Sequence, residues 1–304
     1  IGDWAVYECS SLERFRLPKD LKSIGSMAMQ EWYSIQDIDA SANTEFVVED
    51  GMLMNSKKSM IYRGLASLEG DLYIPSGVST IKSAAFSGCG RIKNLFLPDS
   101  LTTIEDNAFG LCANIKNIDF SEGLASIGDA AFLSCMGLTS ISIPTTVTSI
   151  GKLAFGYCSG LEKVILSEGV KSIGIDAFIS CDKLLNVSVP KTVENIGDGA
   201  FGIMAKDDSR NVLEGFEMSV FSGSAAHKYA KKNKVGYVVI GRSGAKVVFI
   251  AVGILLAVGA IVLAAVLMLK GRKTPDRSAK KAKKKAEQQA VEESYEKILD
   301  DKKK

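Results

Sequence analysis

Six cysteines are the side chains of this sequence best suited to chemistry, because thiols form disulfides, bind metal ions or act as nucleophiles. Five of them recur every 23 residues: Cys89, Cys112, Cys135, Cys158 and Cys181. Cys9 keeps the same register, since it precedes Pro18 by the interval that separates Cys89 from Pro98. Side chains on neighbouring stacked units stand about 4.8 Å apart, whereas the β-carbons of a disulfide lie about 3.8 Å apart. We therefore expect all six to form a buried ladder of reduced thiols rather than disulfides or a metal site.

Few other residues suggest catalysis. His227 is the only histidine in the chain, and it lies in a predicted capping helix, where a structural role is expected. The serines and aspartates recur with the repeat, as residues that shape turns would. We expect no catalytic residue, no cofactor and no bound metal, so the sequence disfavours an enzyme.

The elements that position these residues form a repeat. Phenylalanine recurs with the same period, each time after alanine: Phe86, Phe109, Phe132, Phe155, Phe178 and Phe201. A fixed period in this range is typical of a solenoid, in which each unit buries its apolar side against its neighbours. Each unit begins with alternating apolar and polar residues, as in LEKVILS. This alternation predicts a short strand whose Val164 and Leu166 side chains point inward. The segment DAFISC is too short for a stable α-helix, so we expect a single helical or 3₁₀ turn.

The repeats define the organisation of the chain. They cover residues 1–206, and Ile1–Ala5 aligns with Ile127–Ala131, so we expect an N-terminally truncated solenoid. An insert over about residues 41–68 breaks the period, and its short apolar runs around Asp50-Gly51 predict a projecting hairpin. Residues 207–241 predict a small α+β cap of strand, helix and strand, with Ser224 as the helix N-cap.

The C-terminal region predicts a membrane anchor. After a linker at 242–246, Val247–Leu269 is 23 residues without a charge, long enough to span a bilayer of about 30 Å. The tail, residues 270–304, begins with a cluster of lysines and arginines, which predicts a cytoplasmic C-terminus and extracellular repeats. The same lysines are expected to attract anionic lipid head groups. The net charge of the whole chain is only +2, so we expect no nucleic-acid partner.

One outward position of the repeat gives the candidate partner-binding residues. Two residues before each proline or serine slot stand Tyr73, Phe96, Asp119, Ser142, Ile165 and Ser188. Tyr73 and Phe96 fall side by side in neighbouring units and would anchor a protein partner if exposed. The alternative is that they are scattered surface apolar residues without a function.

The repeat unit resembles a known family. The pattern LxxIxIPxxVxxIGxxAFxxC, densest in LTSISIPTTVTSIGKLAFGYC at Leu138–Cys158, resembles the BspA-like, Treponema-type leucine-rich repeat. The resemblance implies a β-rich leucine-rich-repeat solenoid with a sheet along one face. It also implies a cell-surface protein of a bacterium or a protist, implicated in adhesion to host proteins or other cells. The family carries no shared catalytic residues, so none are transferred.

Two functions follow from these observations. The first is a single-pass, membrane-anchored surface protein that presents its repeats to extracellular or host-cell proteins. The second is a surface receptor that signals, or is internalised, through its tail, where Tyr295-Glu296-Lys297-Ile298 fits a YxxΦ pattern. Removing residues 286–304 would distinguish them, because only the receptor would lose uptake or signalling while attachment is kept.

Overall fold

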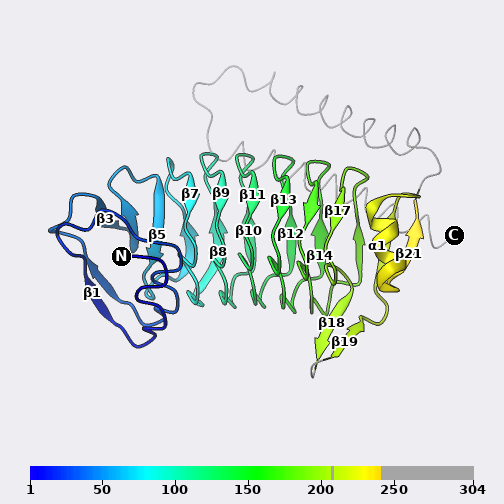
Figure 1. The fold of residues 1–304 in the computed structure, drawn as a ribbon, viewed down its shortest axis with the longest axis horizontal. Coiled ribbons are helices and arrows are strands. Elements are labelled where there is room, and N and C mark those ends of the chain that lie inside the picture. Colours follow the sequence, from blue (N-terminus) through cyan, green and yellow to red (C-terminus); the bar gives the residue numbers. More distant parts are fainter. Residues whose placement is uncertain (207–208, 241–304) are drawn as a thin grey trace, which may run out of the picture. The chain divides into compact units, whose positions relative to one another are not determined.

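The computed structural model of the chain describes residues 1–206 and 209–240, which belong to one compact unit, Ile1–Ile240. Figure 1 shows successive coils of the chain lying side by side along one axis, from blue at the N-terminus to yellow at α1. Each regular coil contributes one strand to each of two faces and closes through a series of turns. The predicted solenoid is therefore confirmed.

The first face is a continuous nine-stranded sheet, here called the long sheet, in the order β17-β15-β13-β11-β9-β7-β5-β4-β3. Its strands are β3 (Phe46–Glu49), β4 (Met52–Asn55), β5 (Met60–Gly64), β7 (Thr80–Ile81), β9 (Thr103–Ile104), β11 (Ser126–Ile127), β13 (Ser149–Ile150), β15 (Ser172–Ile173) and β17 (Asn195–Ile196). The short strands pair in parallel and in register, so that Ser126, Ser149 and Ser172 align. The isoleucines beside them point inward, which suits a half-buried strand.

The other face, here called the second face, is divided into shorter parallel sheets, β1-β2, β6-β8-β10, β12-β14 and β16-β20-β21. Its strands are β1 (Arg14–Arg16), β2 (Asp37–Asp39), β6 (Gly70–Tyr73), β8 (Ile92–Phe96), β10 (Asn117–Asp119), β12 (Ser140–Ser142), β14 (Lys163–Ile165), β16 (Asn186–Ser188), β20 (Glu217–Val220) and β21 (Gly236–Val239). Val164 and Leu166 are 1% and 8% exposed, as the alternation predicts. An antiparallel ribbon of β18 (Ile203–Lys206) and β19 (Ser209–Val212) leaves the coils near their end (Figure 1).

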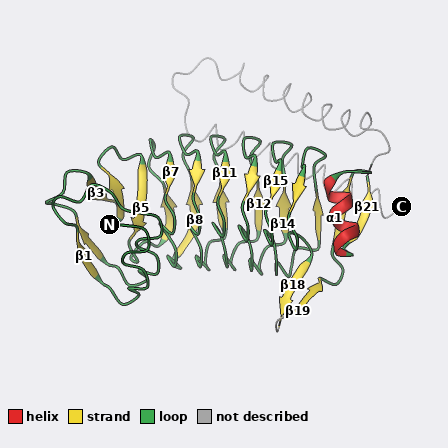
Figure 2. Ribbon diagram, viewed as in Figure 1, coloured by secondary structure: helices red, strands yellow, loops and turns green. Residues whose placement is uncertain are grey.

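The remaining side of each coil, called the turn edge, runs from the end of the long-sheet strand to the next cysteine, as in residues 128–135. The predicted helical or 3₁₀ turn is wrong here, because these segments are turns, and α1 is the one helix in the described ranges (Figure 2). Residues such as Ala130 and Ser134 have φ of 53° and 58°, which breaks any helical run.

Backbone hydrogen bonding explains this departure from a helix. Along the turn edge, every second N–H closes a turn within its own coil, and the alternate ones reach the next coil. The bonds to the next coil are Ala130 N to Lys152 O, Phe132 N to Ala154 O and Ser134 N to Gly156 O, at 2.7–2.8 Å. A helix would direct all its N–H groups within the coil and leave the neighbouring carbonyls without donors.

A column of phenylalanine rings fills the core. Centroids of adjacent rings from Phe86 to Phe201 are 4.9–5.3 Å apart, with interplanar angles of 3–9°. Each ring is at most 1% exposed. Rings stacked at this separation gain aromatic contact in addition to burial, so the column holds the coils in register.

The thiol ladder is confirmed for five of the six cysteines, which are free and buried. The Sγ atoms of Cys112, Cys135, Cys158 and Cys181 each donate to the phenylalanine carbonyl of the preceding coil, at 3.1–3.4 Å. Burial raises the pKa of each of the five thiols, to about 12 for Cys158. The prediction is wrong for Cys9, which is free but exposed, and whose Sγ donates to Tyr7 O of its own coil at 3.8 Å instead of to a carbonyl of a neighbouring coil.

The insert forms short strands and tight turns as predicted, but it does not project from the coil. Strand β5 pairs in parallel with β7, and β4 and β3 follow it in antiparallel order, so the insert extends the long sheet. The physical reason is burial, since Met52, Leu53 and Met54 on β4 are each at most 1% exposed.

Arg63 on β5 ties the insert to the coils on both sides. Its side chain is buried, and its two Nη atoms donate to the carbonyl oxygens of Trp32, Ala84 and Ser87 at 2.7, 2.9 and 3.2 Å. Desolvation by burial lowers the pKa of this guanidinium. The three hydrogen bonds to carbonyl oxygens offset part of the desolvation cost of burying the cation, because hydrogen bonds from charged donors are stronger than those from neutral donors.

A helix closes the C-terminal end of the described solenoid. Helix α1 (Ala225–Asn233) begins at Ser224, the predicted N-cap, whose Oγ accepts from the N–H of His227 at 3.2 Å. Tyr229 on this helix is 5% exposed, and its phenol oxygen donates to Phe201 O at 2.7 Å and accepts from Phe201 N at 2.8 Å. In the other coils that N–H bonds to the alanine carbonyl of the next coil, so the phenol replaces the missing coil.

We expect Tyr229→Phe to lower the free energy of unfolding by about 1–3 kcal/mol, because it leaves a buried N–H without a partner. Urea unfolding of the two proteins measures this loss. Tyr237→Phe is the matched control, since no described hydrogen bond uses the Tyr237 hydroxyl, and it should change the same free energy by less than about 0.5 kcal/mol. Equal effects of the two substitutions would contradict the capping role.

The predicted anchor lies beyond this unit. The span Val247–Leu269, the linker at 242–246 and the tail at 270–304 fall outside the described residues. Within residues 1–206 and 209–240, no helix has the length and apolar character needed to cross a membrane.

Candidate functional site

The six predicted partner-binding residues occupy one register position on the second face. Strand pairing places Phe96 between Tyr73 and Asp119, and it places Ser142 beside Ile165. Ser188 pairs with Ser219 of the cap sheet, and β16 lies beside β14 without pairing with it as a strand. The set is therefore a row with interruptions, in which Tyr73, Phe96 and Asp119 are the members that the structure brings together most closely.

Tyr73 and Phe96 form a stacked aromatic pair. Their ring centroids are 4.5 Å apart with an interplanar angle of 7°, and the side chain of Tyr73 is 53% exposed. Stacking restricts the rotamers of both rings before any partner arrives, so less conformational entropy is lost on binding. An exposed, pre-ordered tyrosine is typical of the residues that dominate protein interfaces.

A polar ladder runs beside the aromatic pair, one outward position earlier on the same strands. The Asn94 side chain donates to Asp71 Oδ1 at 2.6 Å, and the Asn117 side chain donates to Asn94 Oδ1 at 2.7 Å. These bonds fix the orientation of three exposed polar groups. The second face thus combines an apolar anchor with oriented donors and acceptors, the usual composition of a protein-binding surface.

The early coils carry an ion pair at the same register position. Arg16 Nε lies 2.6 Å from Asp39 Oδ2, and both side chains are at the surface. Hydrogen bonds from Ser41, first from its hydroxyl and then from its N–H, together with Arg16, lower the pKa of Asp39 to about 2. The row therefore changes from charged at β1 and β2 to aromatic at β6 and β8.

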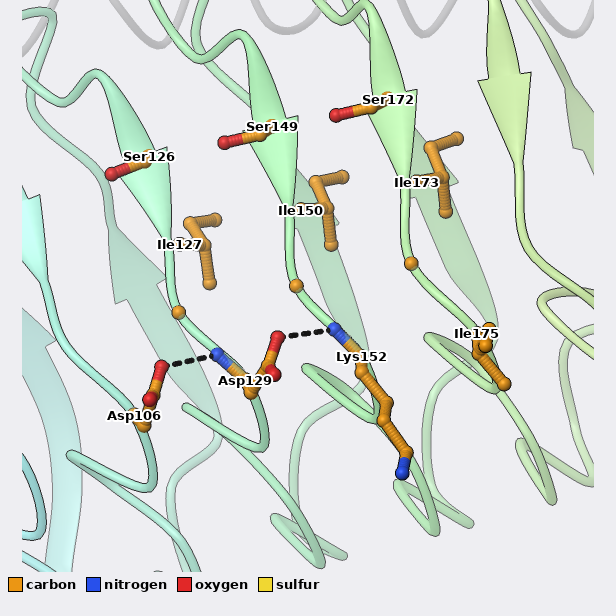
Figure 3. Close-up of a pocket in the computed structure, with 13 residues that line it drawn as sticks. Asp106, Ser126, Ile127, Asp129, Ser149, Ile150, Lys152, Ser172, Ile173 and Ile175 are labelled. Carbon is orange, nitrogen blue, oxygen red and sulfur yellow. Dashed lines mark hydrogen bonds between the residues drawn. The ribbon is translucent and has the colours of Figure 1, made fainter.

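A second feature is a groove on the long sheet, with a volume of about 550 Å³. Figure 3 shows Ser126, Ser149 and Ser172 along one side of it and Asp106, Asp129, Lys152 and Ile175 along the other. Glycines 128, 151 and 174 lie between the two sides. The sequence signal for the groove is the serine that precedes each isoleucine-glycine pair by one position.

The turn edge also carries exposed apolar side chains that the sequence analysis did not predict. Leu111 and Tyr157 are 45% and 42% exposed and have φ of 62° and 58°. The same position holds Gly88, Ser134 and Ser180 in other coils, and such small residues fit that backbone with less strain. The sequence signal was a large apolar residue at a position that holds glycine or serine in other coils.

The chemistry of the described residues gives no reactive centre. Burial keeps five thiols protonated, and a thiol rather than a thiolate is a poor nucleophile and metal ligand. His227 Nδ1 accepts the N–H of Gly223 at 3.0 Å, so this histidine stabilises the start of α1. In residues 1–206 and 209–240, no group of three or more histidine, cysteine, aspartate or glutamate side chains is placed to hold a metal ion.

Comparisons with known proteins agree with the repeat. The family model for the BspA type leucine rich repeat region matches residues 1–63 and 65–206 in six copies. A leucine rich cell surface protein from Faecalibacterium prausnitzii is similar in structure, with 27% identity and a TM-score of 0.53, over 62% of this chain and 48% of that one. No curated protein sequence matches the chain.

Two further solved structures share the fold. A leucine-rich repeat protein from Eubacterium ventriosum has 21% identity and a TM-score of 0.51, over 66% of this chain and 64% of that one. The pneumococcal vaccine antigen PcpA has 17% identity and a TM-score of 0.52, over 76% of this chain and 56% of that one. The chain thus spans about half to just under two thirds of the length of these proteins. The family model covers most of the chain, and the chain belongs to the family of BspA-type leucine-rich-repeat proteins.

Proposed function

We propose that this chain is a cell-surface binding or adhesion module that presents its second face to extracellular or host-cell proteins. The observation that carries the proposal is the stacked pair of the exposed Tyr73 and the half-buried Phe96 on a rigid ladder of strands. The similar protein from Faecalibacterium prausnitzii, described as a cell surface protein, supports the location. No reaction is part of this function, because binding needs only the shape and the side chains of the face.

The anchor belongs to the same proposal. Val247–Leu269 would cross the cell membrane once, leaving the repeats outside and the basic tail inside, where its lysines would meet anionic lipid head groups. A long, stiff solenoid above such an anchor would hold its binding residues clear of the membrane surface. Protease digestion of intact cells tests this arrangement, since it should remove the repeats and leave residues 270–304 protected.

We expect the double variant Tyr73→Ala/Phe96→Ala to weaken binding to a protein partner by at least about 30-fold, because truncating an interface hot spot costs about 2 kcal/mol or more. The measurement is attachment of vesicles that carry the full chain to immobilised extracellular-matrix proteins and to whole cells. Tyr157→Ala is the matched control, since it removes an aromatic side chain of similar exposure from the turn edge instead. It should change attachment by less than about twofold.

Two results would contradict the proposal. One is that the folded chain attaches to none of the surfaces. The other is that the double variant attaches as well as the original protein, which would exclude the aromatic pair as the anchor.

A further inference from the structure

The groove on the long sheet crosses several coils and follows the solenoid axis. Gly128, Gly151 and Gly174, one from each of three successive coils, are among the residues that line it. A Cβ added to Gly151 would lie 2.5 Å from the carbonyl carbon of Gly128, and one added to Gly174 would lie 2.4 Å from the N atom of Lys152. Real atoms do not approach so closely, so side chains cannot occupy these positions. These glycines therefore let the backbones of neighbouring coils approach closely beneath the groove.

The groove has a defined end on its N-terminal side. Glu105 occupies the position that glycine holds in the next four coils. Its carboxylate accepts from Lys82 Nζ at 2.5 Å and from the N–H and the hydroxyl of Ser83 at 3.0 Å. Lys82, Ser83 and Glu105 are not among the residues that line the groove. The open length therefore covers the coils of β11, β13 and β15.

The polar groups of the groove are held in place, and several of their donors and acceptors make no hydrogen bond within the described part of the chain. In the described part of the chain, no hydrogen bond involves the hydroxyls of Ser126, Ser149 and Ser172. Asp106 Oδ1 accepts the N–H of Asp129 at 2.8 Å, and Asp129 Oδ1 accepts the N–H of Lys152 at 2.7 Å (Figure 3). Each of these carboxylates is thereby fixed with its second oxygen available.

The spacing of these groups restricts the ligand. One serine hydroxyl recurs per coil, and adjacent coils are about 5 Å apart, as the ring spacings of 4.9–5.3 Å show. An extended peptide presents side chains on one face only every ~6.6–6.8 Å, which does not keep this register. Two carboxylates on the wall also disfavour a nucleic-acid backbone. The sugar units of an extended β-1,4-linked glycan recur at nearly the coil spacing. Successive units are turned over, so that the same hydroxyl group faces the groove at every second coil and a different hydroxyl group faces it at the coils between.

The wall opposite the serines also suits a sugar chain. Lys152 can donate and the free carboxylate oxygens can accept, which matches hydroxyl groups that both donate and accept. Ile175 is 48% exposed at the rim and offers an apolar contact for the C–H face of a sugar ring. From these features we infer that the groove binds an unbranched, extended β-1,4-linked oligosaccharide, with one sugar unit per coil.

This second site is independent of the aromatic pair on the second face. It lies on the long sheet, and it uses none of the residues assigned to protein binding. Tyr73→Ala/Phe96→Ala should therefore leave glycan affinity unchanged, and Ser149→Val should leave attachment to matrix proteins unchanged. Failure of one proposal is then distinguishable from failure of the other.

Titration calorimetry of the full chain with cellohexaose and chitohexaose tests the inference, in a detergent whose head group contains no sugar. We expect saturable binding of at least one of them and no binding of maltohexaose, whose α-linkages curl the chain. Ser149→Val should weaken the affinity about 3- to 10-fold, the effect of losing one neutral hydrogen bond. Thr80→Val is the matched control, because Thr80 belongs to the same column on the long sheet but lies outside the groove.

Three outcomes would overturn the inference. The first is that neither β-linked hexasaccharide binds to the folded chain. The second is equal affinity for maltohexaose, which would show that extension is irrelevant. The third is a Ser149→Val protein that binds as tightly as the Thr80→Val protein, which would place the sugar elsewhere.

Discussion

Phe132→Ala is expected to lower the free energy of unfolding by about 3–5 kcal/mol, the cost of a cavity left by a buried aromatic side chain. The ring stacks between Phe109 and Phe155 at 5.3 and 5.2 Å, and Phe120 meets its edge at 5.7 Å. Its removal therefore breaks the column at its centre and leaves two rings each without one neighbour. Urea unfolding of the variant measures the loss.

An exposed aromatic residue provides the comparison for this prediction. Tyr73→Ala removes a ring that is 53% exposed, so its cost to folding should stay below about 1 kcal/mol. If Phe132→Ala costs no more than Tyr73→Ala, the phenylalanine column does not hold the coils together.

Raising the pH from 9 to 10 is expected to lower the free energy of unfolding by at least about 1 kcal/mol. Burial raises the pKa of the five ladder thiols above the ordinary thiol value of 9.0, to about 12 at Cys158. Between these values the folded protein keeps its thiol protons while the unfolded chain releases them. The unfolded state then binds fewer protons, so stability falls as pH rises, by about 1 kcal/mol over this interval for Cys158, with a loss of the same sign from the other four thiols.

Urea unfolding at the two pH values, under reducing conditions, measures this loss. Cys158→Ala should reduce the difference between pH 9 and pH 10 by about 1 kcal/mol, since one buried thiol is removed. Cys9→Ser should leave the difference unchanged, because that thiol is exposed. Stability that is equal at the two pH values would show that the thiols are not buried in the folded protein.

The repeat pattern was sufficient to predict most of the fold, because each coil buries its apolar side only against equivalent residues of its neighbours. Because the period stays constant, equivalent residues of successive coils stack in columns. The contacts of Phe132 with Phe109 and Phe155 could therefore be predicted. The N-cap at Ser224 was predictable for a local reason, since one hydroxyl satisfies one N–H of the first helical turn.

Other features could not be predicted from the period. The conformation of the turn edge depends on hydrogen bonds between coils. These bonds hold Leu111 and Tyr157 at positive φ, a conformation that such residues rarely adopt. Arg63 lies in an insert that breaks the period, so nothing in the repeat indicated its three carbonyl partners. The groove likewise follows from close approach of backbones at Gly151 and Gly174, which the sequence shows only as turn residues.

The most direct test of this account is the distance between spin labels placed in the row on the second face. The labels would replace Phe96 and Ser188, four coils apart, in one Cys9→Ser protein, and Ser142 and Ser188, two coils apart, in another. Stacking in register at the strand spacing predicts about 19 Å for the first pair and about 10 Å for the second. Distances that do not grow in proportion to the number of coils would contradict the single row on which the proposed binding face depends.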